Sequence, residues 1–359
     1  MNPNTRSLHA QGQSLWLDNV SRRLLLSGAL ARFIAELSVS GLTLNPTVFE
    51  HAIEHDDAYD AAIHELAAEG LSAEEIFFRL ALDDLAQAAD LFHPIYRASQ
   101  GLDGWVSLEL SPLLANDTGN SIKAARQLHV RAARPNLMIK IPGTPAGLPA
   151  IEQSIADGIP VNVTLLFSRE HYRAAAEAYM RGVERRIAAG LDPAVTCVAS
   201  ISVSPWDSAV VDKVPNEFRN RLGIAIAMRS YKAWRDLLAS DRWQKLVAAG
   251  ARPQRLVWAS TDTKDPLVPD VLYIKALAEP EVITCMSEKT LFAFADHGNL
   301  DQTLSIDEGY SEAVIAEFTR EGIDDEALAA ELQIQGISTL AKSWSDLLYR
   351  IALKSEMLN

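Results

Sequence analysis

The sequence predicts an α/β protein folded as a (βα)₈ TIM barrel with additional helices. Short runs rich in β-branched and apolar residues alternate with longer stretches of helical periodicity, the pattern of a parallel sheet with crossover helices. Eight such runs are present, which is the number that closes this kind of barrel. The runs are SLWLDN (14–19), GLTLNP (41–46), VSLELS (106–111), LMIKIP (137–142), VNVTLLF (161–167), CVASISVS (197–204), RLVWAS (255–260) and EVITCM (281–286).

The segments between these runs carry helix signals. Ser72 and Glu75 form a capping box before the amphipathic stretch that follows them. Residues 47–105 are too many for one crossover helix, so we expect two or more helices there. A helix that packs on the barrel is expected after the first strand, where apolar residues recur at helical spacing: Leu24, Leu25, Phe33, Ile34 and Leu37.

The chain is expected to form one domain over residues 1–359. No Pro-, Gly- or Ser-rich linker divides it, and barrels of this length fold around one continuous core. Residues 1–13 are predicted to be a loose polar arm. Residues 305–353 are predicted to be a C-terminal helical extension, which could cover either its own barrel or a second subunit of a homodimer.

Composition limits the classes of partner. The chain is 48% hydrophobic and 22% charged, and no apolar run approaches the roughly 20 residues that cross a bilayer. A net charge of −14 opposes binding to nucleic acid or to anionic lipid. With no secretory signal at the start, the protein is expected in the cytoplasm with a small-molecule partner. An anionic substrate would need locally placed cations.

Neither the cysteines nor the histidines indicate a metal site. Cys197 and Cys285 lie inside apolar runs, which favours buried reduced thiols over a disulfide. His51, His55 and His64 have no spacing typical of zinc ligands and are expected on the surface. We therefore expect no metal and no cofactor.

Alternation along the strands predicts which side chains share the barrel interior. In the fifth strand, for example, Val161, Val163 and Leu165 are expected to face the helices, and Asn162 and Thr164 the interior. The same rule places the following side chains in the interior: Trp16, Asp18, Thr43, Asn45, Ser107, Glu109, Met138, Lys140, Ser200, Ser202 and Ser204. Most of these polar groups lie near the carboxyl ends of their strands, where barrel enzymes carry their active sites.

Structural explanations also exist for these residues. An interior Lys140 with an interior carboxylate could be an ion pair that fixes strand register. Ser202, Ser204 and Thr43 are expected to bond mainly to neighbouring backbone groups. Asn45 precedes Pro46, which is also typical of a turn.

Lys140 indicates the chemistry of the site, because it is the only lysine inside the eight strands. Burial should lower the pKa of a lysine and leave an amine able to attack a carbonyl. A ketose held as an iminium weakens its neighbouring carbon–carbon bond, and a carboxylate that removes a hydroxyl proton then triggers cleavage. Asp18 and Glu109 are the two interior carboxylates and can take separate duties. The side chains expected to hold sugar hydroxyls or a water are Asn45, Asn162, Thr164 and Ser200.

At this point the chain resembles a known family. The segments SLWLDN, GLTLNPT, NLMIKIPGTPAGLPAIE, VNVTLLFS and LVWASTDTKDP are similar to those of bacterial transaldolases, in the same order, from about residue 12 to about residue 353. The resemblance implies a metal-independent class I aldolase-like barrel with Lys140 as the Schiff-base lysine.

The resemblance also implies roles for the other matching residues. Asp18 would be the acid/base of carbon–carbon cleavage, and Glu109 would act through a water held by Thr164. Asn45 and Asn162 would orient the dihydroxyacetone unit, with Ser200 beside it. Ser260 and Lys264, in the seventh strand and the loop after it, would complete the substrate-binding set.

Two positions depart from the family pattern. Similar members carry an Arg after the interior serines of the sixth strand, where it holds the substrate phosphate, whereas this chain has Pro205. They carry a small residue where this chain has Asp262, whose carboxylate would repel a phosphate. Either the substrate lacks a phosphate at this end, or Arg169, Lys264 or another cation compensates.

The resemblance therefore implies an enzyme that moves a dihydroxyacetone unit between ketose and aldose phosphates, such as sedoheptulose 7-phosphate or fructose 6-phosphate as donor and erythrose 4-phosphate or glyceraldehyde 3-phosphate as acceptor. Three alternatives stay open. They are a specialised transferase with an unusual or unphosphorylated sugar, an aldolase that releases free dihydroxyacetone, and a non-catalytic barrel that binds a sugar phosphate.

Overall fold

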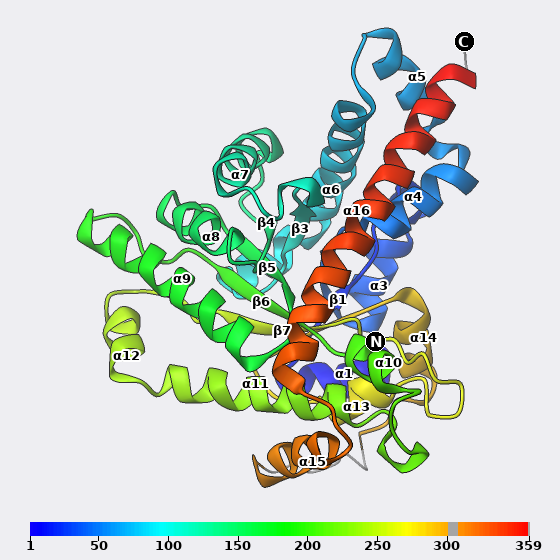
Figure 1. Cartoon of the computed structure of the whole chain (residues 1–359). Coiled ribbons are helices and arrows are strands. Elements are labelled where there is room, and N and C mark those ends of the chain that lie inside the picture. Colours follow the sequence, from blue (N-terminus) through cyan, green and yellow to red (C-terminus); the bar gives the residue numbers. More distant parts are fainter. Residues whose placement is uncertain (301–307, 358–359) are drawn as a thin grey trace.

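A computed structural model describes residues 1–300 and 308–357 of the chain, and within them eight parallel strands close into a barrel in sequence order (Figure 1). Each strand pairs in parallel with the next, and the eighth pairs with the first. The predicted fold class is therefore confirmed. The strands are β1 (Ser14–Leu17), β2 (Val39–Thr43), β3 (Val106–Glu109), β4 (Leu137–Pro142), β5 (Val161–Leu166), β6 (Cys197–Ser202), β7 (Arg255–Ala259) and β8 (Ile283–Met286).

The helices follow the strands and form the outer layer. They are α1 (Pro3–Ala10), α2 (Arg22–Leu26), α3 (Ala29–Leu37), α4 (Pro46–His55), α5 (Asp60–Ala68), α6 (Ala73–Ala98), α7 (Thr118–Ala132), α8 (Gly147–Ala156), α9 (Arg169–Ala188), α10 (Ser204–Val210), α11 (Leu222–Leu238), α12 (Asp241–Ala248), α13 (Leu272–Ala276), α14 (Glu288–His297), α15 (Glu308–Arg320) and α16 (Asp325–Met357). Short 3₁₀ turns lie at Asp57–Tyr59, Pro112–Leu114 and Asn216–Phe218.

Local sequence signals explain several helix boundaries. The capping box of Ser72 and Glu75 opens α6, as predicted. The segment between β2 and β3 holds three α-helices, so the expectation of two or more is confirmed. The single helix expected after the first strand is two helices, because Gly28 adopts φ 70° between α2 and α3.

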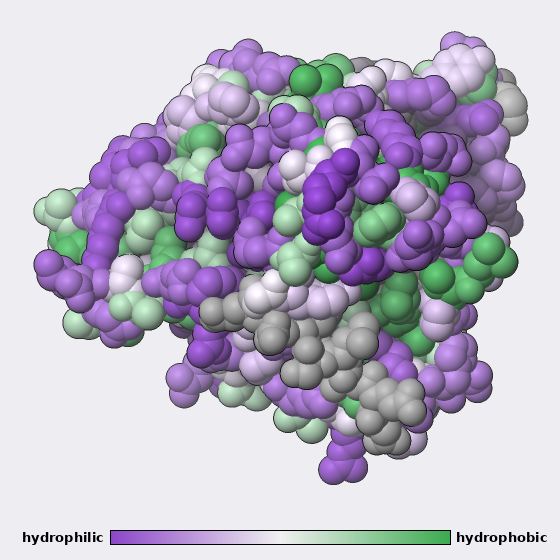
Figure 2. Space-filling view, turned by 60° about the horizontal axis from the view of Figure 1, so that its bottom comes forward, coloured by the Kyte–Doolittle hydropathy of each residue, from purple (hydrophilic) through white to green (hydrophobic). Residues whose placement is uncertain are grey.

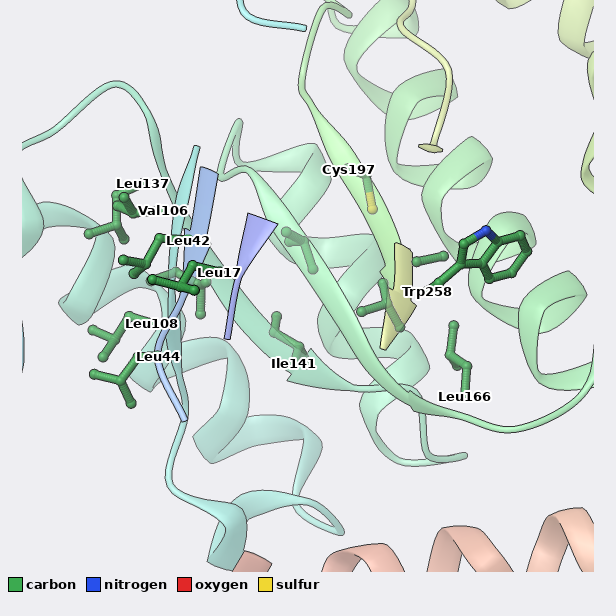
Figure 3. Packing of buried hydrophobic residues seen from close by; sticks show 14 of the residues in the cluster. Leu17, Leu42, Leu44, Val106, Leu108, Leu137, Ile141, Leu166, Cys197 and Trp258 are labelled. Atoms are coloured by element: carbon green, nitrogen blue, oxygen red, sulfur yellow. The ribbon is translucent and has the colours of Figure 1, made fainter. Parts of the chain in front are cut away.

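The outward side chains of the strands form the main core against the helices (Figure 3). Leu17, Leu42, Leu108, Ile141 and Trp258 come from five different strands and are fully buried or within 1% of it. Alternation along each strand therefore separates an apolar outer face from the interior face.

The first residues are not the loose arm that the sequence predicted. Residues 3–10 form α1, and Asn2 caps that helix by accepting from the backbone N–H groups of Asn4 and Thr5. The side-chain amides of Asn2 and Asn4 donate to the carbonyl of Ala295 in α14, and Leu8 is buried. Capping and one buried leucine stabilise a segment whose composition alone is polar.

The predicted C-terminal extension is helical, and residues 305–307 of it lie outside the described part. A second hydrophobic cluster joins α15 and α16 to α10 and α11, with Phe318, Leu332 and Trp206 among its members. Farther along α16, Trp344, Leu347 and Ile351 belong to the main core beside α4, α5 and α6 (Figure 1). The extension therefore covers its own barrel.

The exterior is mainly hydrophilic on the face shown in Figure 2, with hydrophobic residues scattered among charged and polar ones. Among the described residues, no helix combines the length and apolar character needed to cross a membrane.

Candidate active site

A pocket opens at the carboxyl ends of the strands and encloses about 650 Å³ of empty space, part of it open to solvent. All eight strands, or the residues that follow them, contribute to it, as does α16. Its lining residues are Asp18, Thr43, Asn45, Pro46, Glu109, Lys140, Asn162, Thr164, Leu165, Ser200, Ser202, Val257, Ala259, Ser260, Cys285 and Leu340. The structure thus brings together eight of the nine predicted site residues, and only Lys264 lies elsewhere.

Lys140 and Glu109 form an ion pair at the floor of this pocket. They occupy paired positions of β4 and β3, and the Lys140 Nζ donates to the Glu109 Oε2 at 2.9 Å. Nζ also donates to the backbone carbonyl of Leu44 at 3.3 Å. Both side chains are largely buried, so water screens the pair little. Glu109 is therefore placed to take a proton from the lysine.

The pKa of Lys140 is raised, contrary to the expectation from burial alone. Burial is the largest single influence and lowers the pKa, but the charges of Glu109 and then Asp18, together with the hydrogen bond that Lys140 donates to Glu109, outweigh it. The raised pKa favours the protonated form of the amine. It must give up a proton before it can attack a carbonyl.

The carboxylate of Asp18 is fixed by two neighbours on the adjacent strand. Its Oδ1 accepts from the Thr43 hydroxyl at 2.9 Å, and its Oδ2 accepts from the Asn45 amide at 3.1 Å. Asn45 also caps α4 through its Oδ1, which accepts from the backbone N–H of Thr47. The turn role and the site role suggested for Asn45 are thus both present. Thr43 bonds to this carboxylate rather than mainly to the backbone, so that prediction is wrong.

A chain of hydrogen bonds crosses the pocket wall from β3 to β6. The Ser200 hydroxyl donates to the Asn162 Oδ1 at 2.8 Å, and the Asn162 amide donates to the Ser107 hydroxyl at 3.3 Å. All three side chains are buried. These two hydrogen bonds fix the orientation of the Asn162 amide beside β4, the strand that carries Lys140.

Thr164 presents a buried hydroxyl that meets no hydrogen-bond partner among the described residues. It lies on β5 at the position paired with Pro142 of β4. A buried hydroxyl without a partner is unusual, and a pocket facing it offers room for a water or a substrate oxygen.

Leu165 departs from the predicted alternation. The pairing of β5 with β6 shifts between Val163 and Leu166, which marks a bulge, and Leu165 adopts φ 58° inside it. As a result Leu165 lines the pocket with Thr164, while Leu166 packs into the outer core. The expectation that Leu165 lies on the outer face with Val161 and Val163 is therefore wrong: its side chain lines the pocket and packs against the second hydrophobic cluster.

The residues expected near a substrate phosphate are scattered. Ser260 lines the pocket, but Lys264 is exposed in a separate hollow beside Arg219. Pro205 is the second residue of α10, where proline is common. Asp262 does not line the pocket, and its Oδ1 accepts from the hydroxyls of Ser287 and Thr290 at the start of α14, at 2.8 and 2.6 Å.

The remaining cation suggested for that end does not reach the pocket. Arg169 pairs with Glu170 at 2.7 Å at the start of α9. Among the residues that line the pocket, all of which are described, Lys140 is the only cation. Ser204 is likewise outside the pocket, because β6 ends at Ser202 and Ser204 begins α10.

Several lining residues were not predicted as site residues. Thr43 and Ser202 were assigned backbone roles, and Cys285 was assigned to the core. Leu340 comes from α16, far along the chain, and no local pattern could have found it. The alternation of β8 would have placed Cys285 on the face of Ile283, and the two residues share the interior cluster of Trp16 and Met138.

The cysteines and histidines carry no metal-binding geometry. Cys197 and Cys285 are free and buried, as predicted, and burial raises the pKa of both thiols. His51 and His55 are exposed and stack on each other, whereas His64 is half-buried. Over residues 1–300 and 308–357, no group of three or more His, Cys, Asp and Glu side chains is arranged to hold a metal ion.

Comparison with known proteins identifies the family of the chain. The family model for transaldolase/fructose-6-phosphate aldolase matches residues 15–351. The transaldolase of Thermobifida fusca is 42% identical over 358 residues, which cover 97% of each chain. That of Mycolicibacterium smegmatis is 41% identical over 97% of this chain and 96% of its own, and transaldolase 2 of Nostoc punctiforme is 39% identical over the same shares. The chain belongs to the transaldolase/fructose-6-phosphate aldolase family.

Proposed function

We propose that this chain is a transaldolase of the type that acts in the pentose phosphate pathway, and that it carries a dihydroxyacetone unit on Lys140 as a Schiff base. The observation that supports this most is the placement of one buried lysine between two carboxylates, Glu109 at 2.9 Å and Asp18 across the same pocket. The family relationship and the relatives' names support the same activity.

The reaction begins with proton transfer from Lys140 to Glu109. The neutral amine attacks the carbonyl carbon of the ketose, and the resulting carbinolamine loses its hydroxyl as water. We propose that a water held by the free hydroxyl of Thr164 relays protons between this intermediate and Glu109 during that step. The product is an iminium joined to Lys140.

Cleavage then depends on Asp18. Its carboxylate, oriented by Thr43 and Asn45, removes the proton from the hydroxyl on the carbon at the far end of the bond that breaks, and this carbon becomes the aldehyde of the leaving aldose. The electron pair of that bond moves toward the iminium, an aldose leaves, and an enamine stays on the lysine. Addition of the enamine to an acceptor aldose reverses these steps and completes the transfer. Asn45, Asn162 and Ser200 are proposed to orient the three retained carbons.

A second candidate concerns the far end of the sugar. The pocket offers hydroxyls from Ser202 and Ser260 there, and among its lining residues Lys140 is the only cation. This observation favours a related transferase whose sugar carries no phosphate at that end. The ordinary substrates require Lys264 or Arg219, on the neighbouring hollow, to reach the phosphate.

Borohydride trapping tests the proposal and separates the candidates. With fructose 6-phosphate, reduction should leave a sugar adduct on Lys140, located by mass mapping. Adducts with the phosphorylated ketose alone would support the ordinary transaldolase, and equal trapping of fructose would support the second candidate. If none of the ketoses tested leaves an adduct, the result would indicate a non-catalytic sugar-binding barrel. Release of dihydroxyacetone without an acceptor would indicate an aldolase.

Two further properties are proposed with the activity. Two buried, unpaired cysteines are suited to a reducing compartment, which supports the cytoplasm. A homodimer is also proposed. It would have to use surfaces other than the apolar side of α16, since that side covers its own barrel.

A further inference from the structure

Helix α16 covers one side of the pocket although it lies after the last strand. Leu340 contributes directly to the lining, and Gly336 lies one turn before it. A Cβ on Gly336 would come within 2.8 Å of the Leu165 side chain, so the absence of a side chain allows a close approach of the helix to β5. The helix is therefore in contact with the bulge that carries Thr164 and Leu165.

Gln333 makes the polar contact between this helix and the strands. Its side chain is 8% exposed, and its Nε2 donates to the backbone carbonyl of Leu165 at 2.9 Å and to that of Gly143 at 3.2 Å. One amide group thus joins the ends of β5 and β4. Without Gln333, each carbonyl would lose this donor.

The carbonyl that Gln333 holds belongs to a backbone in an unfavourable conformation. Leu165 adopts φ 58°, in the left-handed region that a residue with a Cβ disfavours. The preceding carbonyl, of Thr164, is held from the other side by the Gly143 N–H at 2.7 Å. Together these hydrogen bonds fix the peptide on each side of Leu165, and so fix the direction of the Thr164 side chain.

We infer that Gln333 is a positioning residue for the reaction: by holding the bulge at Leu165, it directs the free Thr164 hydroxyl into the pocket beside Lys140 and Glu109. The inference rests on the proposed function, because it concerns the step that Thr164 assists. Gln333 itself does not line the pocket and touches no reacting atom.

A merely structural role for Gln333 makes a different prediction. If the hydrogen bonds only attached α16 to the barrel, removing them would lower thermal stability without a specific effect on the step that uses Thr164. The two roles are therefore separated by the rate of imine formation, and by whether Gln333 and Thr164 act together.

The experiment uses the full chain and dihydroxyacetone as the probe. This triose can form the imine but lacks the carbon–carbon bond that the enzyme cleaves in a longer ketose. Borohydride trapping, followed as intact mass against time, therefore reports imine formation alone. The variants are Gln333→Met, Thr164→Val and the double variant. The control is Gln335→Met, since Gln335 is exposed on the same helix and its side-chain amide donates to Glu331, away from the strands.

Gln333→Met and Thr164→Val should each slow trapping roughly tenfold, and the double variant should be no slower than Thr164→Val alone. Gln335→Met should match the unchanged chain. Multiplied effects in the double variant, or a Gln333→Met rate equal to that of the unchanged chain, would overturn the inference. If Gln333→Met does not fold, Gln333→Asn gives the same test, because its amide is one methylene too short to reach both carbonyls.

Failure of the proposed function gives a separate result. If the unchanged chain acquires no adduct on Lys140, the Schiff-base proposal itself fails. If the unchanged chain is trapped and Gln333→Met is trapped equally fast, only the role of Gln333 fails.

Discussion

Lys140 and Glu109 lie at paired positions of neighbouring strands, and their charged groups are 2.9 Å apart. The protonated lysine therefore lies beside the carboxylate that is proposed to accept its proton. Such a pair keeps the pocket free of an uncompensated buried charge before a sugar arrives. It also makes the first step of the proposed reaction a transfer within a hydrogen bond that already exists.

Replacing Lys140 with Met should abolish the adduct and lower turnover by at least about a thousandfold, because none of the other residues that line the pocket carries an amine. Trapping with fructose 6-phosphate and a coupled transfer assay would measure both. Lys245→Met, on the exposed side of α12, is the matched control and should behave like the unchanged chain. Retained turnover in Lys140→Met would contradict the assignment of the nucleophile.

Glu109→Gln should lower the pKa of Lys140, because it removes the largest of the charges that raise that pKa and leaves the effect of burial in place. The pH at which trapping reaches half its maximal rate should fall, while turnover at neutral pH falls too, since the proton acceptor is lost. Asp18→Asn should move the midpoint in the same direction but less far. An unchanged or higher midpoint in Glu109→Gln would show that this carboxylate does not control the amine.

Thr43→Val should affect cleavage more than imine formation. Valine has nearly the shape of threonine but cannot donate to the Asp18 Oδ1, so the carboxylate loses one of its two orienting hydrogen bonds. We expect turnover to fall roughly tenfold, the equivalent of about 1.4 kcal/mol. Trapping with dihydroxyacetone should change little. Equal losses in both assays would mean that Thr43 supports the pocket as a whole.

Asp207 should make stability depend on pH. It is 7% exposed and accepts from the N–H groups of Leu222 and Gly223 and from the hydroxyl of Tyr273, and burial raises its pKa to about 6. Since the folded pKa exceeds the unfolded value of 3.8, the folded chain binds this proton more tightly. The stabilisation of the folded chain by this proton is therefore complete below about pH 4 and is lost as the pH rises through about 6.

Asp207→Asn removes that titration and isolates it. The free energy of unfolding of the unchanged chain, minus that of the variant, should be greater at pH 4 than at pH 7, by about 3 kcal/mol at most. Urea unfolding followed by circular dichroism across this range would measure it. A constant difference between the two proteins would show that folding does not raise the pKa of Asp207.

Strand alternation predicted much of the site. Asp18, Glu109, Lys140, Asn162 and Ser200 face one interior because side chains of a barrel strand alternate. No spatial information was needed to group them. The identity of each hydrogen-bond partner, such as Thr43 for Asp18, depends on register between strands, which the pattern does not contain.

Alternation failed where the backbone stops being regular. A leucine at positive φ has no sequence signal, so the bulge at Leu165 could not be anticipated. The position of Ser204 outside the sixth strand could have been anticipated. Pro205 beside it is typical of the first turn of a helix, which indicates that the strand ends earlier. The raised pKa of Lys140 required distances, because burial and two carboxylates act in opposite directions.

The contact between Gln333 and Leu165 joins positions 168 residues apart, and it comes from a helix that follows all eight strands. The strands supply the amine and the acids, whereas α16 supplies a wall and the alignment of one hydroxyl. Because the strands and α16 are different segments of the chain, their contributions can change independently during evolution. Substitutions between residues 325 and 357 can retune how fast a sugar is captured, or which sugar fits under Leu340, and leave the barrel with its lysine intact.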